Sequence, residues 1–489
     1  MGARLWIDVE DLFEYARSNS RPSGIQRVAF EIYKILQQRN GDRGLVYFVR
    51  HDPRRGSLRI VPWTEVAVLF TSLIEEALLP SAMAGEIRPH SSVRQFFREW
   101  THRLPATLRI RVTDVMLSQV QMLQAWGKLL VLLGRSALET PGWIARSYRA
   151  RVGRIGSSAK TSDQSFSSLA KPGDVFLVLG SPWSHPNYDT LVRALRERHG
   201  LRFALLIYDL IPLRRPEWCD RGLVRVFRAW FGGVFPLADH LFAISRATAV
   251  DVEKYARERG IILPIPVALL PIGTGFGTGS STISAPGTGR LPKPGSYALI
   301  VSTIEARKNH LLLFRVWRRL LEELPPDRVP TLVFAGRVGW LVDDLMHQIA
   351  NTNNLNGKLV VISSPTDAEL TKLYQGCLFT LFPSFFEGWG LPVTESLAFG
   401  KPCLISDRTS LPEAGGLLAR SFDPDNFYDA YAAIRNAIED RAGLAAWEVQ
   451  IRREFTPVPW SATVDALLSG LNDSSATVPD EVAGMPAAS

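Results

Sequence analysis

Short apolar runs alternate with helix-length amphipathic segments along most of the chain. An apolar run bounded by turn residues predicts a buried strand, and apolar residues at helical spacing predict a helix packed against it. In the first half, the predicted strands are residues 4–9, 45–50, 58–62, 174–181, 203–212 and 237–245, with helices over 29–39, 188–199 and 246–259. In the second half, they are residues 297–304, 331–340, 358–363, 377–383 and a run from 402, with helices over 310–323, from 392 and over 427–438.

Strands separated by helices predict parallel βαβ units, and hence two doubly wound α/β domains. In such sheets, ligands bind outside the carboxyl ends of the strands. We assign residues 1–272 to an N-terminal domain and residues 296–471 to a C-terminal domain. Residues 273–295 are rich in Gly, Ser, Thr and Pro and are predicted to be a flexible linker. Residues 472–489 are predicted to be a disordered tail.

Residues 63–171 interrupt the alternation and are interpreted as a mostly helical insertion in the N-terminal domain. Residues 94–160 contain twelve Lys or Arg and three acidic residues, so this segment carries the whole formal net charge of +8. Basic helices with aromatic residues can lie on an anionic membrane surface. A helical subdomain with a solvated basic face explains the same pattern. Nucleic acid is not expected as a partner, because no recognised binding motif accompanies the charge.

The composition is that of a globular protein, with 46% apolar and 21% charged residues, and 489 residues are too many for one core. The three cysteines lie far apart without metal-ligand spacing, which indicates free thiols in a reducing compartment. Asp8, Glu10 and Asp11 lie where a secretion signal needs an apolar run. No run has the roughly 18 apolar residues of a spanning helix. We therefore expect a cytoplasmic protein, at the inner face of the membrane if residues 94–160 dock on lipid.

Candidate chemistry is concentrated in residues 381–407, LFPSFFEGWGLPVTESLAFGKPCLISD. Here a strand leads through a glycine turn into a helix. Gly388 and Gly390 lack a Cβ, so their backbone N–H groups can come close to a ligand. Pro392 suits the first turn of the helix. A helix N-terminus in this position predicts an anion site.

Two carboxylates flank that turn. Glu387 lies in the loop and Glu395 in the first turn of the helix, with seven residues between them. A carboxylate beside an anion site would repel phosphate, so we expect both to accept hydrogen bonds from hydroxyls of a sugar and a ribose.

Further candidates follow other predicted strands of the C-terminal domain. Arg307 and Lys308 lie after the strand 297–304, and two cations there can neutralise a leaving diphosphate without a metal ion. Gly336 and Arg337 lie toward the tip of the next predicted strand, 331–340, and are expected to face the same ligand.

The N-terminal domain has its own candidates at predicted strand ends. Gly24 and Arg27 lie at the glycine turn that leads into the first long helix. Five more candidates lie at the ends of later strands or in the loops after them: Gly180, Trp183, His185, Asp209 and Ser245. A surface role for Arg27 and an incidental position for His185 explain those two residues equally well.

Several of these motifs resemble one known family. FPSFFEGWGLPVTES is similar to the Glu-x7-Glu signature of retaining, nucleotide-sugar-dependent glycosyltransferases of family 4, and residues 410–416, SLPEAGG, resemble the segment that follows it. TIEARKN, at residues 303–309, and RPSGIQRV, at residues 21–28, resemble a mannosyltransferase-like branch. Lys308 matches the family's lysine, whereas Thr303 occupies the usual arginine position and Arg307 is expected to supply the second cation.

The segment YDLIP departs from the family pattern, because Tyr208 stands where many members have histidine. Either Tyr208 or His185 could take that place, and Asp209 is retained as a candidate for orienting the site. The resemblance covers residues 174–471 well and residues 4–37 loosely, and it leaves out residues 63–171.

The resemblance implies a GT-B fold, in which two Rossmann-like domains face a cleft and the last helix, 460–471, returns to the first domain. It implies a retaining hexosyltransferase, most plausibly one that uses GDP-mannose, with neither a cofactor nor a metal. The implied catalytic residues are Glu387, Arg307, Lys308 and Asp209. The implied donor-binding residues are Glu395, Gly388, Trp389, Gly390, Leu391, Thr394, Gly336 and Arg337. The implied acceptor-side residues are Gly24, Arg27, His185 and Ser245.

The expected partners are a nucleotide sugar and a saccharide acceptor. If residues 94–160 contact an anionic membrane, the acceptor is expected to be linked to a polyprenyl diphosphate, in the synthesis of a bacterial surface polysaccharide. A GT-B epimerase or phosphorylase fits the same fold with a different reaction. A non-catalytic GT-B binding scaffold is the third alternative, which the complete set of motif residues disfavours.

Overall fold

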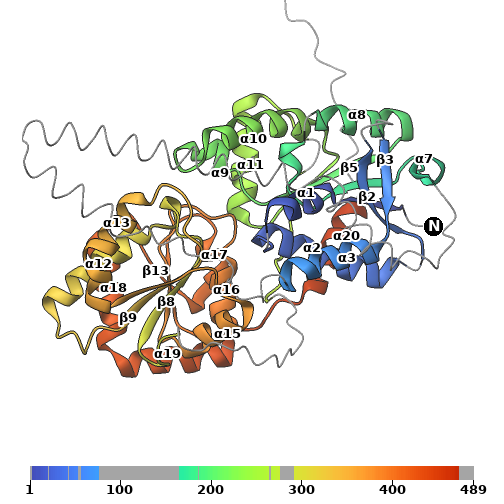
Figure 1. Ribbon diagram of the computed structural model, residues 1–489. Coiled ribbons are helices and arrows are strands. Elements are labelled where there is room, and N and C mark those ends of the chain that lie inside the picture. Colours follow the sequence, from blue (N-terminus) through green and yellow to red (C-terminus); the bar gives the residue numbers. More distant parts are fainter. Residues whose placement is uncertain are drawn as a thin grey trace, which may run out of the picture. The chain divides into compact units, whose positions relative to one another are not determined.

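The computed structural model describes residues 3–19, 21–41, 43–52, 57–75, 165–185, 187–263, 266–275 and 291–472 (Figure 1). The described residues belong to one unit of the chain. The basic segment 94–160, most of the linker 273–295 and the tail from residue 473 lie outside the described residues, and so do the predictions made for them.

The first domain is built on a seven-stranded sheet with the order β3-β2-β1-β4-β5-β6-β7. All neighbours are parallel except β3, an edge strand that pairs antiparallel with β2. The chain runs from β1 outward to β3 and then returns to β4 on the other side of β1. The switch point of this sheet therefore lies between β1 and β4. Its strands are β1 (Leu5–Asp8), β2 (Val46–Asp52), β3 (Ser57–Val61), β4 (Val175–Val178), β5 (Arg202–Ile207), β6 (His240–Ala243) and β7 (Ala268–Leu269).

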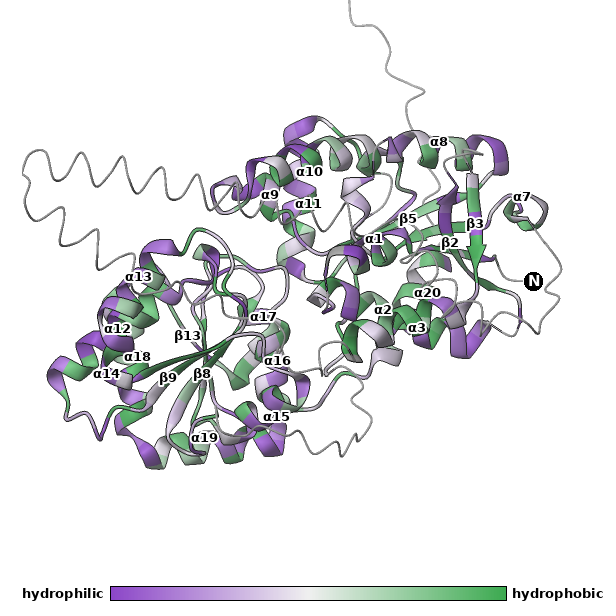
Figure 2. Cartoon of the chain, in the orientation of Figure 1, coloured by the Kyte–Doolittle hydropathy of each residue, from purple (hydrophilic) through white to green (hydrophobic). Residues whose placement is uncertain are grey.

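Helices cover both faces of this sheet, because successive strand residues point to opposite sides. Leu5 and Ile7 belong to the core that α2, α3 and α20 share, whereas Trp6 belongs to the core under α8, α10 and α11. Figure 2 shows the strands in hydrophobic colours and polar residues on the helices. The helices are α1 (Glu10–Ser18), α2 (Gly24–Asn40), α3 (Trp63–Glu75), α7 (Phe166–Leu169), α8 (Tyr188–His199), α9 (Ile211–Arg214), α10 (Arg221–Val234) and α11 (Arg246–Arg259), with short 3-10 turns η2 (Pro182–Ser184), η3 (Pro216–Trp218) and η4 (Phe235–Leu237).

The second domain has a six-stranded parallel sheet with the order β10-β9-β8-β11-β12-β13. Its strands are β8 (Tyr297–Val301), β9 (Thr331–Ala335), β10 (Leu359–Ile362), β11 (Thr380–Phe382), β12 (Cys403–Ser406) and β13 (Arg420–Phe422). Its helices are α12 (His310–Glu323), α13 (Asp343–Asn351), α14 (Asn353–Gly357), α15 (Asp367–Gly376), α16 (Leu391–Ala398), α17 (Leu411–Gly415), α18 (Phe427–Glu439) and α19 (Arg441–Glu454), with 3-10 turns η6 (Ala306–Lys308) and η7 (Gly416–Leu418).

The last helix, α20 (Trp460–Asn472), packs into the first domain. Trp460, Val464 and Leu467 belong to the core shared with α2, and the hydroxyl of Thr463 donates to the carbonyl of Pro271 at 2.6 Å. α20 therefore packs with the first domain although it follows the second in sequence.

The prediction of two Rossmann-like domains is confirmed, with corrections in the first. The edge strand β3 is antiparallel, so that sheet is not wholly parallel. Val66, Phe70 and Leu73 of α3, the helix at the start of the predicted insertion, are buried in the core of this domain. The sequence reading also missed α10, although its apolar residues, among them Phe227 and Phe231, follow helical spacing. The three cysteines are free thiols, as expected.

Candidate functional site

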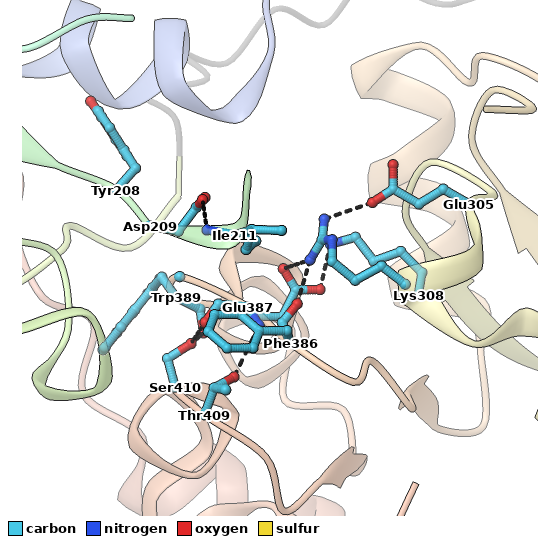
Figure 3. Close-up of polar contacts among 12 residues, drawn as sticks. Tyr208, Asp209, Ile211, Glu305, Lys308, Phe386, Glu387, Trp389, Thr409 and Ser410 are labelled. Atoms are coloured by element: carbon cyan, nitrogen blue, oxygen red, sulfur yellow. Dashed lines mark hydrogen bonds and ion pairs between the residues drawn. The ribbon is translucent and has the colours of Figure 1, made fainter. Parts of the chain in front are cut away.

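Glu387 pairs with both cations that the sequence predicts for a donor diphosphate, and Figure 3 shows Glu387 beside Lys308. Its carboxylate pairs with Arg307 (Nη1 to Oε2, 2.9 Å) and with Lys308 (Nζ to Oε1, 2.5 Å). The side chains are largely buried, with 12%, 15% and 17% exposure for Glu387, Arg307 and Lys308. Three predicted catalytic residues from distant parts of the sequence thus meet in the fold.

Sheet order explains this meeting. Arg307 and Lys308 lie in η6, after β8, and Glu387 follows β11. Because β8 and β11 are parallel neighbours, the loops after them emerge at the same edge of the sheet. The backbone N–H of Phe385 donates to the carbonyl of Arg307 at 3.0 Å, which ties the two loops together.

Glu305, which the sequence analysis did not select, completes the charge balance. Its carboxylate pairs with Arg307 at 2.6 Å, and Arg307 also donates to the carbonyl of Phe386. Burial acts to raise the pKa of Glu387, but Arg307 and Lys308 outweigh it and lower that pKa to about 2. Two carboxylates therefore balance two cations, and an entering diphosphate must compete with Glu387 for them.

The turn that carries Glu387 is held by residues at the start of α17. The N–H of Glu387 donates to the hydroxyl oxygen of Thr409 at 2.9 Å. The hydroxyl of Ser410, which is fully buried, lies 2.9 Å from the carbonyl of Glu387 and 2.8 Å from that of Trp389. The segment SLPEAGG, noted only as a similarity, thereby positions the candidate carboxylate.

Gly388 packs against the first domain. A Cβ on this residue would lie 2.2 Å from the carbonyl oxygen of Tyr208 and 3.1 Å from Cβ of Asp209. Its own carbonyl accepts from the hydroxyl of Thr248 at 3.4 Å. The sequence analysis expected a ligand close to Gly388, but the backbone of Tyr208 fills the space beside its Cα. A contact between the Gly388 amide and the donor stays a prediction.

We expect Gly388→Ala to lower thermal stability and activity together, because overpacking of this kind costs about 1–3 kcal/mol. Thermal unfolding and nucleotide affinity measure the effect. The matched control is Gly232→Ala in α10, where the nearest atom to a new Cβ is 3.9 Å away. An unchanged unfolding temperature for Gly388→Ala would contradict the packing argument.

Asp209 and Tyr208 follow β5 on the first-domain side. Asp209 is half-buried and accepts from the N–H of Ile211 at 3.0 Å. Burial raises the pKa of Asp209, against the opposing effects of the Ile211 N–H and of Arg307. Tyr208 is 8% exposed and its hydroxyl donates to the carbonyl of Leu179 at 2.7 Å, and whether Tyr208 or His185 takes the place of the family's histidine stays a prediction.

Glu395 lies in α16 and accepts from the hydroxyl of Tyr374 at 2.9 Å. Burial raises the pKa of Glu395 to about 7, although the hydrogen bond from Tyr374 acts to lower it. The assignment of Glu395 to the ribose stays a prediction.

Four other residues predicted to bind the donor lie in or just before the first turn of α16: Trp389, Gly390, Leu391 and Thr394. Gly390 has φ of 119° and precedes Leu391, the first residue of α16, and the hydroxyl of Thr394 bonds back to the carbonyl of Leu391 at 2.9 Å. The indole N–H of Trp389 is buried and has no hydrogen-bond partner in the part of the chain that the structure describes.

Gly336 and Arg337, which were also predicted to bind the donor, follow the last residue of β9. A Cβ on Gly336 would lie 1.9 Å from the carbonyl oxygen of Ser302, so this glycine serves close backbone packing. Arg337 is exposed.

The predicted acceptor-side residues do not form one group. Gly24 begins α2, and a Cβ there would lie 3.3 Å from Leu391. Arg27 of α2 forms an ion pair with Asp367 of α15 at 2.8 Å, so its side chain connects two helices rather than pointing only into solvent. Ser245 is buried and caps α11 by accepting from the N–H of Thr248 at 3.0 Å. His185 lies beside His51.

Among the described residues, no group of three or more His, Cys, Asp or Glu side chains is arranged to hold a metal ion. The predicted independence from metal stays a prediction. A search of the same residues finds no helix with the length and apolar character needed to span a bilayer.

A family model described as "Glycosyl transferases group 1" matches residues 287–452, a range that contains Arg307, Lys308, Glu387 and Glu395. The chain is 28% identical over 299 residues to the serotype-specific mannosyltransferase WbdA of Escherichia coli, covering 58% of this chain and 35% of that protein. It is 33% identical over 144 residues to the O-antigen chain mannosyltransferase B of Escherichia coli, covering 29% of this chain and 37% of that protein. The chain thus spans little more than a third of the length of these curated relatives.

Among solved structures, the crystal structure of TarM aligns with a TM-score of 0.45 and 12% identity, covering 61% of this chain and 55% of TarM. That of Anabaena Alr3699/HepE in complex with UDP and glucose aligns with a TM-score of 0.45 and 15% identity, covering 61% of this chain and 78% of HepE.

Proposed function

We propose that the chain is a glycosyltransferase of the GT-B type that moves a hexose from a nucleotide sugar to a saccharide acceptor. The observation that carries this proposal is the meeting of Arg307, Lys308 and Glu387 at the carboxyl ends of β8 and β11. This is the edge where doubly wound sheets bind nucleotides. The group 1 family match covers the same residues and supports the reaction class.

In the proposed reaction, the bond from sugar C1 to the diphosphate breaks and a bond from C1 to an acceptor oxygen forms. The acceptor hydroxyl's proton passes to the leaving diphosphate. Arg307, Lys308 and the N-terminus of α16 would stabilise the negative charge that develops on that group. Glu387 would exchange its two cations for hydroxyls of the donor sugar, which a carboxylate binds well. Asp209 is proposed to orient the acceptor.

The donor we propose is GDP-mannose, with retention at C1. Support for mannose comes from two relatives in Escherichia coli, both mannosyltransferases, at 28% and 33% identity. Retention and metal independence rest on the Glu-x7-Glu resemblance. The acceptor is proposed to be a saccharide of a bacterial surface polysaccharide, carried on a polyprenyl diphosphate if the basic segment docks on an anionic membrane.

The test is a screen of nucleotide sugars for thermal stabilisation and for nucleoside diphosphate release, with and without oligosaccharide acceptors. We expect GDP-mannose to stabilise the protein most and to yield a glycoside product without added phosphate. A requirement for phosphate would favour a phosphorylase, and a changed nucleotide sugar without acceptor would favour an epimerase. Absence of any nucleotide effect would overturn the proposal.

Glu395 gives this proposal a pH dependence. Its pKa is raised to about 7, chiefly by burial. Ribose hydroxyls donate more strongly to a carboxylate than to a carboxylic acid, so we expect donor affinity to increase as pH rises through 7. If only the ionised form binds, the increase between pH 6 and pH 8 is about tenfold. Titration calorimetry with GDP at several pH values measures it.

Glu395→Gln is expected to remove that slope, because an amide does not titrate, whereas the exposed Glu322→Gln should keep it. A wild-type affinity that does not change between these pH values would argue against placing the ribose at Glu395.

A further inference from the structure

A second cluster of buried titratable side chains lies in the first domain, apart from the donor residues. Asp8 ends β1, His51 is near the end of β2, and His185 and Tyr188 follow β4. Asp8 is 2% exposed and the His51 side chain 6%. The cluster borders the switch point between β1 and β4, where a doubly wound sheet opens a crevice for ligands.

Asp8 and His51 form a buried pair. Oδ2 of Asp8 lies 3.0 Å from Nε2 of His51, and the carboxylate also accepts from the hydroxyl of Tyr188 and, at 2.9 Å, from the N–H of Glu10. Burial acts to lower the pKa of His51, but attraction to Asp8 outweighs it and raises that pKa. Burial acts to raise the pKa of Asp8, and His51 holds it below its usual value. The carboxylate at the base of the cluster is therefore charged.

Two imidazole nitrogens in this cluster lack partners. Nδ1 of His51 and Nδ1 of His185 are buried, and neither has a hydrogen-bond partner among the residues that the structure describes. The two rings are nearly perpendicular, with centroids 4.2 Å apart. A buried polar atom without a partner costs about 1–3 kcal/mol, so a hydrogen-bonding ligand at this position would be stabilised.

The solvent side of the cluster is acidic. Glu14 and His185 are partly exposed, and the hydroxyl of Ser184 donates to Glu14 at 3.3 Å. Glu10 is already neutralised by Arg50 at 2.6 Å. The charged and titratable groups that face His51 are three carboxylates, one arginine and one histidine: Asp8, Glu10, Glu14, Arg50 and His185. With His51 protonated, which its raised pKa favours, and His185 neutral, which its lowered pKa favours, the cluster carries one net negative charge.

We propose that Asp8, Glu14, His51 and His185 form a recognition site for an uncharged sugar ring of the acceptor and exclude a phosphorylated one. The carboxylate of Glu14 can accept from sugar hydroxyls, and an imidazole can donate or accept. The same carboxylates repel phosphate, since like charges in a partly buried site interact strongly. Naming the ligand an acceptor rests on the proposed function, whereas the preference for an uncharged sugar rests on this cluster alone.

The experiment compares methyl α-mannoside with mannose 6-phosphate as probes, by saturation-transfer NMR on the full chain. We expect the neutral sugar to bind and the phosphate to bind at least about tenfold more weakly. Glu14→Lys should abolish the discrimination by raising the affinity for mannose 6-phosphate about tenfold. His185→Phe should weaken binding of the neutral sugar about fivefold, because a phenyl ring cannot make the hydrogen bond of the imidazole.

The control is Glu322→Lys, the same charge change at an exposed position of α12. Glu14→Lys should bind GDP as the wild type does, which reports that the variant is folded. Equal binding of both probes by the wild type, or unchanged discrimination in Glu14→Lys, would overturn the inference. If GDP fails to bind every variant while discrimination persists, the proposed glycosyl transfer fails and the neutral-sugar site stands.

Discussion

Lys308→Met should lower the rate of glycosyl transfer by about 10²–10³-fold, the loss typical of removing one group that stabilises transition-state charge. The Lys308 ammonium pairs with Glu387 in the ligand-free chain and is proposed to follow the diphosphate as it leaves. The fold should tolerate the change, because Glu387 keeps Arg307 as a partner at 2.9 Å. Steady-state kinetics with a saturating donor measure the effect as a fall in kcat.

The matched control is Lys372→Met, an exposed lysine on α15 of the same domain, which should keep the wild-type rate. If the Lys308→Met enzyme kept both its unfolding temperature and its full kcat, the proposal that the diphosphate binds at Lys308 would be wrong.

Glu387→Gln is expected to separate binding from transfer. The pKa of Glu387 is lowered to about 2, so the substitution removes a full negative charge at neutral pH. Arg307 and Lys308 then lose the carboxylate that competes with a diphosphate. We expect GDP to bind about tenfold more tightly, and glycosyl transfer to fall about 100-fold because the sugar hydroxyls lose a charged acceptor.

Titration calorimetry and kinetics measure these two effects on the same preparation. The exposed Glu322→Gln should change neither quantity. Weaker GDP binding by Glu387→Gln would show that Glu387 supports the nucleotide rather than competing with it, and a full transfer rate in Glu387→Ala would exclude its role toward the sugar.

The candidate site was predictable where each motif is local in sequence. Arg307 and Lys308 follow a strand, and Glu387 lies in a glycine turn before a helix, patterns that a strand–loop–helix unit imposes on neighbouring residues. The cap of α15 is local in the same sense: Thr366 and Glu369 form the reciprocal pair of a capping box. Such features depend on backbone geometry within a few residues.

Other features depend on residues far apart in sequence. Asp8 and Glu10 were read only as charges that exclude a secretion signal, yet they form buried pairs with His51 and Arg50 on β2. Gly388 was read as an opening for a ligand, yet it packs on the carbonyl of Tyr208. Neither relation has a sequence signal, because each contact is set by strand order and by the packing of separate segments.

By itself, the sequence determined two α/β domains and the strand ends that carry the candidate residues, since apolar periodicity and turn chemistry are local. Only the tertiary structure decided which charges neutralise one another. The parallel adjacency of β8 and β11 places Glu387 on Arg307 and Lys308, and the pairing of β1 with β2 brings His51 to Asp8. Electrostatic partners are chosen by distance in space, and that distance exists only once the sheets have formed.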